Sequence, residues 1–309
     1  MAKRLAADRQ NRATSLTSRF AVNRSRKVGV RRARALAAAQ SGLYDDPAIY
    51  DILHEPGTAS EVRTMLRVWK RVGAGSPRVA LEPACGTGRY LVRLPGWKVF
   101  GFDSDPAMVK FAKARFRNKA FASPRIWRDR FDAFGPKIKA GSVGLAFCPI
   151  NSIRHVSSDA EMVRHLKMIR RSLAPAGIYA VGISLSAYGL EAPTEDIWSG
   201  ARKGVIVKQV VNYTPAAGAD GRAARGERVD SVLEITRGRH TEIRSSSYSL
   251  FSYSREQWEN VIQRSGLHVI GMVNEFATKF DPGRIGYAIW LLARPDHPLA
   301  VRRKRNIKG

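Results

Sequence analysis

The order of apolar and polar residues along the chain predicts strands that alternate with helices. Apolar runs with the length of a buried strand recur at 79–82, 97–102, 143–148 and 178–185. Helices are predicted before and between them, at 59–72, 89–94, 105–116 and 158–173. Strands and helices in this alternation are typical of a parallel sheet that is covered on both faces.

Beyond about residue 204 the pattern changes to successive strands. They are predicted at 205–213, 228–236 and 240–253, which favours an antiparallel arrangement. A helix at 254–266 and strands at 268–272 and 286–293 complete the chain. The pairs Ser158/Glu161 and Ser254/Gln257 predict capping boxes at the starts of two of the helices.

The charge of the chain is large and unevenly distributed. There are 53 Lys and Arg against 26 Asp and Glu, a formal net charge of +27. Residues 1–40 contain eleven of the basic residues and one acid, and five more lie among the last ten positions. Such tails are solvated extensions or arms that bind nucleic acid, and residues 1–40 also have the composition of a transit peptide.

Several classes of protein are excluded by composition. With 44% hydrophobic residues the chain can form a sizeable core, and no apolar run approaches the length of a membrane span. The start does not have the pattern of a secretory signal peptide. Two cysteines, Cys85 and Cys148, are too few for a disulfide framework and suit a reducing compartment. We therefore expect a cytoplasmic protein, or a mitochondrial matrix protein if residues 1–40 are a transit peptide.

The candidate chemistry lies in the turn that follows the first predicted strand. Its glycines, Gly86 and Gly88, would leave backbone N–H groups free to bind an anionic or polar ligand. Glu82 at the end of that strand would repel a pyrophosphate but suits a ligand that carries an ammonium or sulfonium group. Asp103 ends the next strand, where a carboxylate can accept hydrogen bonds from both hydroxyls of a ribose.

These segments resemble the class I S-adenosylmethionine-dependent methyltransferases. The matching stretches, in family order, are 82–88, 101–108, 129–134, 147–152 with His155, and 173–177. The resemblance extends from Tyr44 to Pro295. It implies an α/β, Rossmann-like sheet of seven mostly parallel strands with an antiparallel last strand, helices on both faces and a small β-rich insertion.

The resemblance also implies S-adenosylmethionine as cofactor, with no metal. Gly86 and Gly88 would approach its methionine part, Glu82 would hold its amino end, and Asp103 would bind its ribose. Asp129 would meet the adenine amine, unless it forms an ordinary surface ion pair.

The remaining cofactor-binding candidates are Ala84, Ser104, Arg130 and Cys148. Two departures from the family pattern concern this region. Ala84 stands where the family usually has its first glycine, and the predicted helix at 89–94 is about one turn short.

The acceptor is less constrained by the sequence, because a sulfonium methyl is already activated and alignment is the main requirement. His155 is the one candidate general base, although a lone histidine near the start of a helix more often has a structural role. Asn151 and Tyr213 are candidates for contact with the acceptor. The tip of the fourth strand, 148–151, lacks the motif of enzymes that methylate exocyclic amines of nucleic-acid bases.

Three functions follow. The first is a methyltransferase that acts on a small molecule, the second an RNA methyltransferase guided by the basic tails, and the third a non-catalytic, cofactor-binding interaction module. We expect a basic tail (1–40), a methyltransferase core (41–203 and 254–296), a β-rich insertion (204–253) and a second tail (297–309). No membrane partner is expected, and the sequence leaves the oligomeric state open.

Overall fold

The computed structural model describes residues 42–117, 124–280 and 286–301. The predictions for the tail at 1–40, and those for the second tail beyond residue 301, lie outside these residues. Within the described ranges, the chain contains no helix that is both long and apolar enough to span a membrane.

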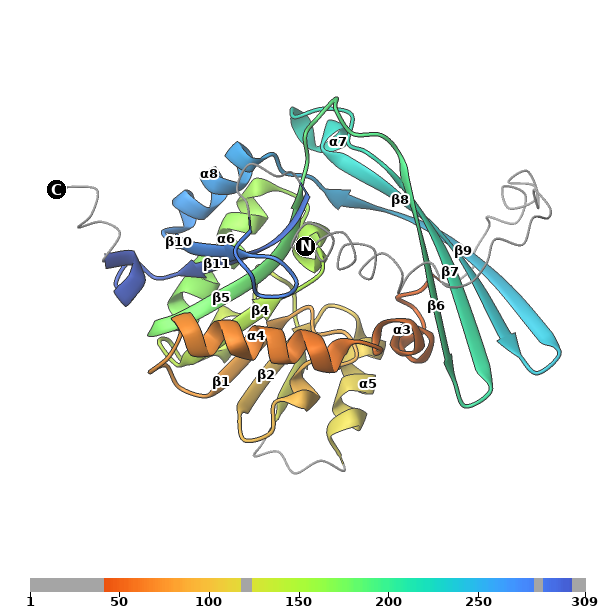
Figure 1. The fold of residues 1–309 in the computed structure, drawn as a ribbon, viewed down its shortest axis with the longest axis horizontal. Coiled ribbons are helices and arrows are strands. Elements are labelled where there is room, and N and C mark those ends of the chain that lie inside the picture. Colours follow the sequence, from red (N-terminus) through yellow and green to blue (C-terminus); the bar gives the residue numbers. More distant parts are fainter. Residues whose placement is uncertain (1–41, 118–123, 281–285, 302–309) are drawn as a thin grey trace, which may run out of the picture. The chain divides into compact units, whose positions relative to one another are not determined.

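Seven strands form a central sheet in the order β10-β11-β5-β4-β1-β2-β3 (Figure 1). Neighbours from β5 to β3 pair in parallel, whereas β11 is antiparallel to both β5 and β10. The α/β fold class is thereby confirmed. The bounds are β1 Val79–Pro83, β2 Lys98–Asp103, β3 Arg125–Arg128, β4 Val143–Cys148, β5 Leu173–Leu185, β10 His268–Val273 and β11 Gly286–Ala293.

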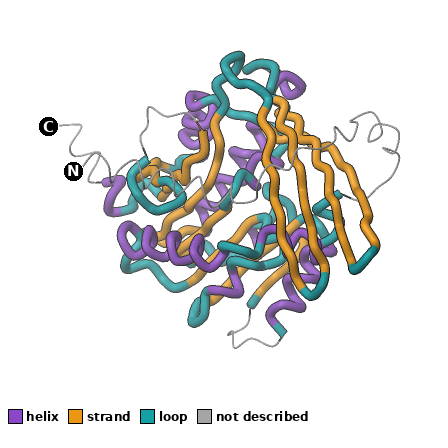
Figure 2. The backbone as a smooth tube through the Cα atoms, turned by 45° about the vertical axis from the view of Figure 1, so that its right-hand side comes forward, coloured by secondary structure: helices purple, strands orange, loops and turns teal. Residues whose placement is uncertain are grey.

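Helices cover both faces of this sheet (Figure 2). Apolar side chains of α4 (Thr58–Val72) and α5 (Pro106–Phe116) pack in one core cluster, and those of α6 (Asp159–Ser172) and α8 (Arg255–Ser265) pack in another. Successive strand residues, such as Leu145 and Ala146, belong to different clusters. This division follows from the alternation of side chains along a strand.

Some local elements differ from the prediction. The segment predicted as a helix at 89–94 forms only a short 3-10 helix, η2 (Leu91–Arg93), because Pro95 disfavours a helical Leu94. Strand β5 begins at Leu173, before the predicted start at residue 178. The cap at Ser158 forms, but the Glu161 carboxylate accepts the N–H of Ser157 instead of that of Ser158. Both hydrogen bonds of the capping box at Ser254 and Gln257 are present.

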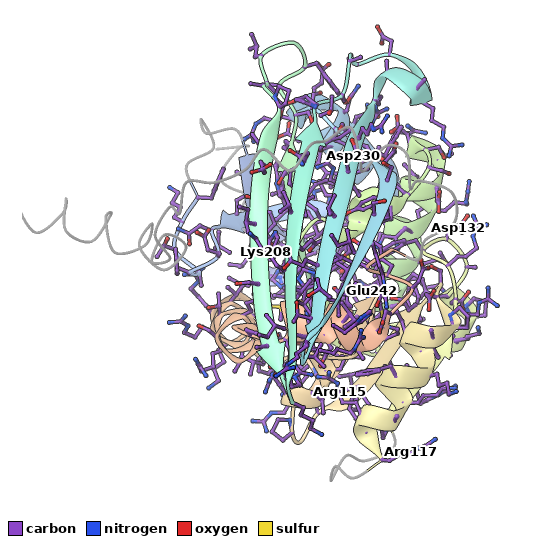
Figure 3. The ribbon with its side chains drawn as sticks, turned by 90° about the vertical axis from the view of Figure 1, so that its right-hand side faces the viewer. Arg115, Arg117, Asp132, Lys208, Asp230 and Glu242 are labelled. Carbon is purple, nitrogen blue, oxygen red and sulfur yellow. The ribbon has the colours of Figure 1, made fainter. Side chains whose placement is uncertain are left out.

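A second, antiparallel sheet contains four strands, β6 (Thr194–Arg202), β7 (Val205–Thr214), β8 (Gly226–Arg237) and β9 (His240–Phe251). We call it sheet B; Figure 3 faces its strands, with Lys208 and Asp230 labelled. The three predicted strands are present, and β6 is an additional one. Most residues of β6 are exposed, so this edge strand lacks the apolar alternation that would predict it. The division of the chain into domains remains a prediction.

Helix α3 (Pro47–His54) lies beside sheet B (Figure 1). Asp46 caps it by accepting the N–H of Ile49 at 3.3 Å. Buried Ile49, Ile52 and Leu53 pack with residues of β7 and β8: Val207, Leu233 and Ile235. This packing holds sheet B near the carboxyl ends of the central strands, where the predicted site residues lie.

Candidate active site

The loop after β1 has an unusual backbone. Ala84, Gly86 and Gly88 all have a positive φ, of 51°, 50° and 71°. Glycine adopts this conformation readily, but for Ala84 the left-handed region costs about 1–2 kcal/mol. The N–H of Cys85 donates to the carbonyl of Phe102 at 2.9 Å, which ties the loop to β2. A strained loop that is held in place in this way is a frequent feature of ligand sites.

Asp103, the last residue of β2, binds the same loop through its side chain. Its Oδ2 accepts the N–H of Gly86 at 2.8 Å, and its Oδ1 accepts the N–H of Asp105 at 3.0 Å. Burial raises the pKa of Asp103, although these backbone hydrogen bonds act in the opposite direction. The carboxylate therefore lies directly beside the glycine loop, as its position at the strand end predicts.

Glu82 is a buried acid beside the loop with an unsatisfied side-chain oxygen. Its residue is 2% exposed, and its Oε2 has no hydrogen-bond partner. Burial raises the pKa of Glu82 well above its usual range; the guanidinium of Arg89 opposes this shift and the Asp103 carboxylate adds to it. A buried carboxylate oxygen without a partner is costly for the fold, so it suits a cationic ligand group that would complete it.

Asp129 follows β3, and its own backbone N–H donates to the carbonyl of Asp103 at 3.0 Å. Its carboxylate accepts hydrogen bonds from Lys137 at 2.7 Å, Trp127 at 2.9 Å and the N–H of Arg130 at 3.0 Å. Burial alone would raise the pKa of Asp129, but the Lys137 and Trp127 hydrogen bonds lower it. Asp129 thus forms an ion pair with Lys137, which is the alternative that the sequence analysis gave for this residue.

The other cofactor candidates near these acids differ in exposure. Ser104 is exposed, and its carbonyl accepts a hydrogen bond from Arg128 at 3.0 Å. Arg130 is exposed and lies 3.1 Å from Asp132. Cys148 is fully buried at the end of β4, where burial raises the pKa of its thiol.

Asn151 connects the tip of β4 to β5. Its Oδ1 accepts the N–H of Ser184 at 2.6 Å and its Nδ2 donates to the hydroxyl of the same residue at 3.0 Å. Its backbone has a φ of 58°, and the preceding Ile150 is also left-handed, at 54°. These contacts use both polar atoms of the Asn151 side chain to shape the strand end.

Aromatic side chains from three parts of the chain form a continuous array that contacts the loop through Tyr50. The array consists of Tyr44, Tyr50, His54, His155, Trp198 and Tyr248. Ring centroids of successive members lie 4.5–5.9 Å apart. At one end, a Cβ added to Gly86 would lie 3.7 Å from the Tyr50 ring, so the array reaches the glycine loop.

Two of the residues predicted to contact the acceptor, His155 and Tyr213, lie in or next to this aromatic array. His155 packs against Tyr44 and Tyr248, with centroid distances of 5.6 Å to each. It remains accessible to solvent, yet desolvation by its neighbours and the Arg154 guanidinium lower the pKa of His155 to about 4. Tyr213 lies in the same cross-strand row of sheet B as Tyr248, with Val229 between them.

Asp51 and Arg89 are site residues that the sequence analysis missed. Asp51 is 1% exposed, and its carboxylate accepts a hydrogen bond from Thr87 of the loop at 2.8 Å. Arg89 is 5% exposed and donates to Thr58 at 2.6 Å, and its guanidinium opposes the rise that burial causes in the pKa of Glu82. The only sign of these residues in the sequence is that each is a charged residue among apolar ones. Their hydrogen-bond partners Thr87 and Thr58 lie 36 and 31 residues away, so the sequence does not reveal the pairing.

The structure brings Glu82, Gly86 and Asp103 into one place and puts Asp129 at the end of the neighbouring strand. His155 and Tyr213 lie with the aromatic array instead. In the part of the chain that the structure describes, no cluster of three or more His, Cys, Asp or Glu residues could hold a metal ion.

Part of the chain is similar in sequence to known proteins. A family model described as a methyltransferase domain matches residues 80–177, which include the glycine loop and Asp103. Trans-aconitate 2-methyltransferase from Methylobacterium radiotolerans is 33% identical over 81 residues, or 25% of this chain. The match spans 30% of that relative's length.

Solved structures share the fold at low sequence identity. An S-adenosylmethionine-dependent methyltransferase from Clostridium acetobutylicum has a TM-score of 0.64 and 14% identity, with 80% of this chain and 96% of that chain covered. DesVI from Streptomyces venezuelae has a TM-score of 0.63 and 15% identity over 82% of this chain and 99% of its own. The sugar N-methyltransferase KedS8 from Streptoalloteichus has a TM-score of 0.59 and 17% identity, with coverages of 90% and 100%. The chain therefore contains a segment, residues 80–177, that matches a methyltransferase domain, and it shares the fold of S-adenosylmethionine-dependent methyltransferases.

Proposed function

We propose that this protein transfers the methyl group of S-adenosylmethionine to a small-molecule acceptor. The observation that carries the proposal is the buried Oε2 of Glu82, which has no partner and lies at the strand end before the glycine loop. The amino group of the cofactor would donate a hydrogen bond to this oxygen. Its positive charge would also favour the ionised form of Glu82.

The residues around Glu82 supply the other contacts that the cofactor needs. The loop at Gly86 and Gly88 would approach its methionine part, and Asp103 would accept hydrogen bonds from its ribose. Asp129 would receive the adenine amine, with Ala84, Ser104, Arg130 and Cys148 lining the remainder. When bound, the cofactor supplies a methyl group on a positively charged sulfur. The protein then has to orient the acceptor and exclude water.

The aromatic array supports a small acceptor, because its rings contact one another and one of them, Tyr50, lies beside the glycine loop. At neutral pH the pKa of about 4 keeps the His155 imidazole uncharged, so a ring nitrogen can accept a hydrogen bond from an acceptor, although the group is a weak base. Tyr213 would contribute through its row with Tyr248. Asn151 would act by holding the strand end, since its side chain is engaged with Ser184.

The named relatives favour the same class of acceptor. Trans-aconitate 2-methyltransferase and a sugar N-methyltransferase are both named for small molecules. The alternative function, methylation of RNA guided by basic tails, depends on residues outside the described part of the chain. We therefore keep it as an outcome of the experiment on the acceptor.

The cofactor contacts can be tested by calorimetric titration with S-adenosylhomocysteine. We expect stoichiometric binding, and loss of the Asp103 hydrogen bonds in Asp103→Ala should weaken it by about 1.5–3 kcal/mol, or roughly 10- to 150-fold in Kd. Gly86→Arg should abolish binding, because it places a side chain against the Tyr50 ring at a left-handed position. Asp296→Ala is the control, since Asp296 pairs with Arg294 away from the loop. Undiminished binding in both loop variants would disprove the site.

The raised pKa of Glu82 predicts that binding is coupled to proton release. In the free protein the carboxyl stays protonated above its usual pKa, whereas a bound ammonium group favours the carboxylate. Affinity for S-adenosylhomocysteine should therefore rise as the pH is raised above the usual pKa of a glutamate. The heat of binding should also vary with the ionisation enthalpy of the buffer. Glu82→Gln should reduce both effects, and an unchanged pH slope in this variant contradicts the assignment.

The acceptor class can be identified with radiolabelled S-adenosylmethionine and a size-fractionated cell extract. We expect label in the low-molecular-weight fraction, in equal amounts for the full chain and for a variant without residues 1–40. Gly86→Arg serves as the inactive control. Label in the RNA fraction that falls when residues 1–40 are deleted would instead establish RNA methylation. Cofactor binding without any labelled product would point to the non-catalytic module.

A further inference from the structure

We propose that Asp51 is a positioning residue that couples the cofactor loop to sheet B. Ligand binding at the loop would then fix the position of the aromatic side chains that sheet B carries. The proposal rests on the proposed function, because it takes the loop as the cofactor site and the array as the acceptor side.

The contacts of Asp51 extend in two directions. Its Oδ1 accepts hydrogen bonds from Thr87 of the loop at 2.8 Å and from Arg115 of α5, a residue labelled in Figure 3. Its Oδ2 accepts a hydrogen bond from Arg202 of β6 at 2.6 Å, and Arg202 also donates to the Asp51 carbonyl at 3.0 Å. One carboxylate therefore holds the loop, α5 and the edge strand of sheet B.

A second observation shows that β6 packs tightly on α3 at this place. Gly200 lies on β6, and a Cβ at this position would come within 2.4 Å of the Ile52 carbonyl oxygen. Trp198 contacts His54 with a centroid distance of 5.8 Å. Residues 198, 200 and 202 alternate along the strand and so share one face, which is the face that meets α3.

The same helix contacts the cofactor loop through other side chains. Tyr50 lies beside Gly86, and the next residue of the helix, Asp51, accepts the hydrogen bond from Thr87. Helix α3 is thus in contact with the loop and with β6 at once. A change in the loop that shifts Thr87 or Tyr50 is therefore transmitted to the strand that carries Trp198.

The charge on Asp51 makes it costly to break the contacts between the loop, α5 and β6. Burial alone would raise the pKa of Asp51, but the guanidiniums of Arg202 and Arg115 lower it below its usual value. The residue is 1% exposed and ionised, so the loss of a partner leaves a buried charge that is only partly compensated. Coupling of this kind is reciprocal, so that occupation of the acceptor side would also strengthen binding at the loop.

Hydrogen exchange with and without S-adenosylhomocysteine tests the coupling on the full chain. In the wild-type protein the ligand should slow exchange at residues 84–88 and also at residues 194–214, by about fivefold or more at the latter. A purely structural role of Asp51 would change the stability of these segments but not their response to the ligand.

Arg202→Gln separates the two ends of the connection, because Arg115 still neutralises Asp51 in this variant. We expect the ligand to protect residues 84–88 as before, with less than about twofold protection at 194–214. Arg237→Gln is the matched control: Arg237 lies in the same cross-strand row as Arg202 but pairs with Glu242. It should behave like the wild type. Asp51→Asn should lose the protection of 194–214 as Arg202→Gln does.

The possible failures are distinguishable. If the ligand protects 84–88 in the wild type and leaves 194–214 unchanged, the coupling is wrong and the proposed function stands. If protection of 194–214 persists in Arg202→Gln, Asp51 does not carry it. If S-adenosylhomocysteine does not bind the wild-type protein at all, the proposed function and the coupling both fail.

Discussion

Three carboxyl groups that are largely shielded from water, on Asp51, Glu82 and Asp103, determine the arrangement of the functional end of this protein. A buried charge has to be neutralised or hydrogen-bonded, and each of these acids meets that requirement differently. Asp51 has arginines from α5 and β6, and Asp103 has the backbone N–H groups of Gly86 in the loop and of Asp105 just before α5. Glu82 retains an oxygen without a partner. The first two residues build the site, and the third leaves room in it for a cation.

This arrangement changes the meaning of the net charge of +27. Much of that charge lies on the tails, and in the folded part Arg115 and Arg202 neutralise the buried Asp51. The chemistry therefore depends on a few acids in a basic chain. Strain at Ala84 and the unsatisfied Glu82 both reduce the stability of the unliganded protein, a common property of binding sites.

The sequence predicted what depends on local pattern and on family motifs. The strand at 143–148 and the helix that starts at Pro106 form as predicted, because apolar runs and capping residues act over short distances. The glycine loop and its acids are found together because parallel strands end at one edge of a sheet. The partners of Asp51 could not be predicted, since Thr87, Arg115 and Arg202 lie 36, 64 and 151 residues away. Strand β6 escaped prediction because its stability comes from pairing and from the contact of Gly200 with α3.

The central claim is that the acids at the ends of β1 and β2 hold S-adenosylmethionine beside the aromatic array. The most direct measurement is a crystal structure of the protein with S-adenosylhomocysteine bound. The account predicts the ligand's amino group within hydrogen-bond distance of Glu82 Oε2, its ribose hydroxyls on Asp103 and its sulfur toward Tyr50. A ligand bound elsewhere, or bound here with Glu82 still unpartnered and Asp103 free of the ribose, would contradict it.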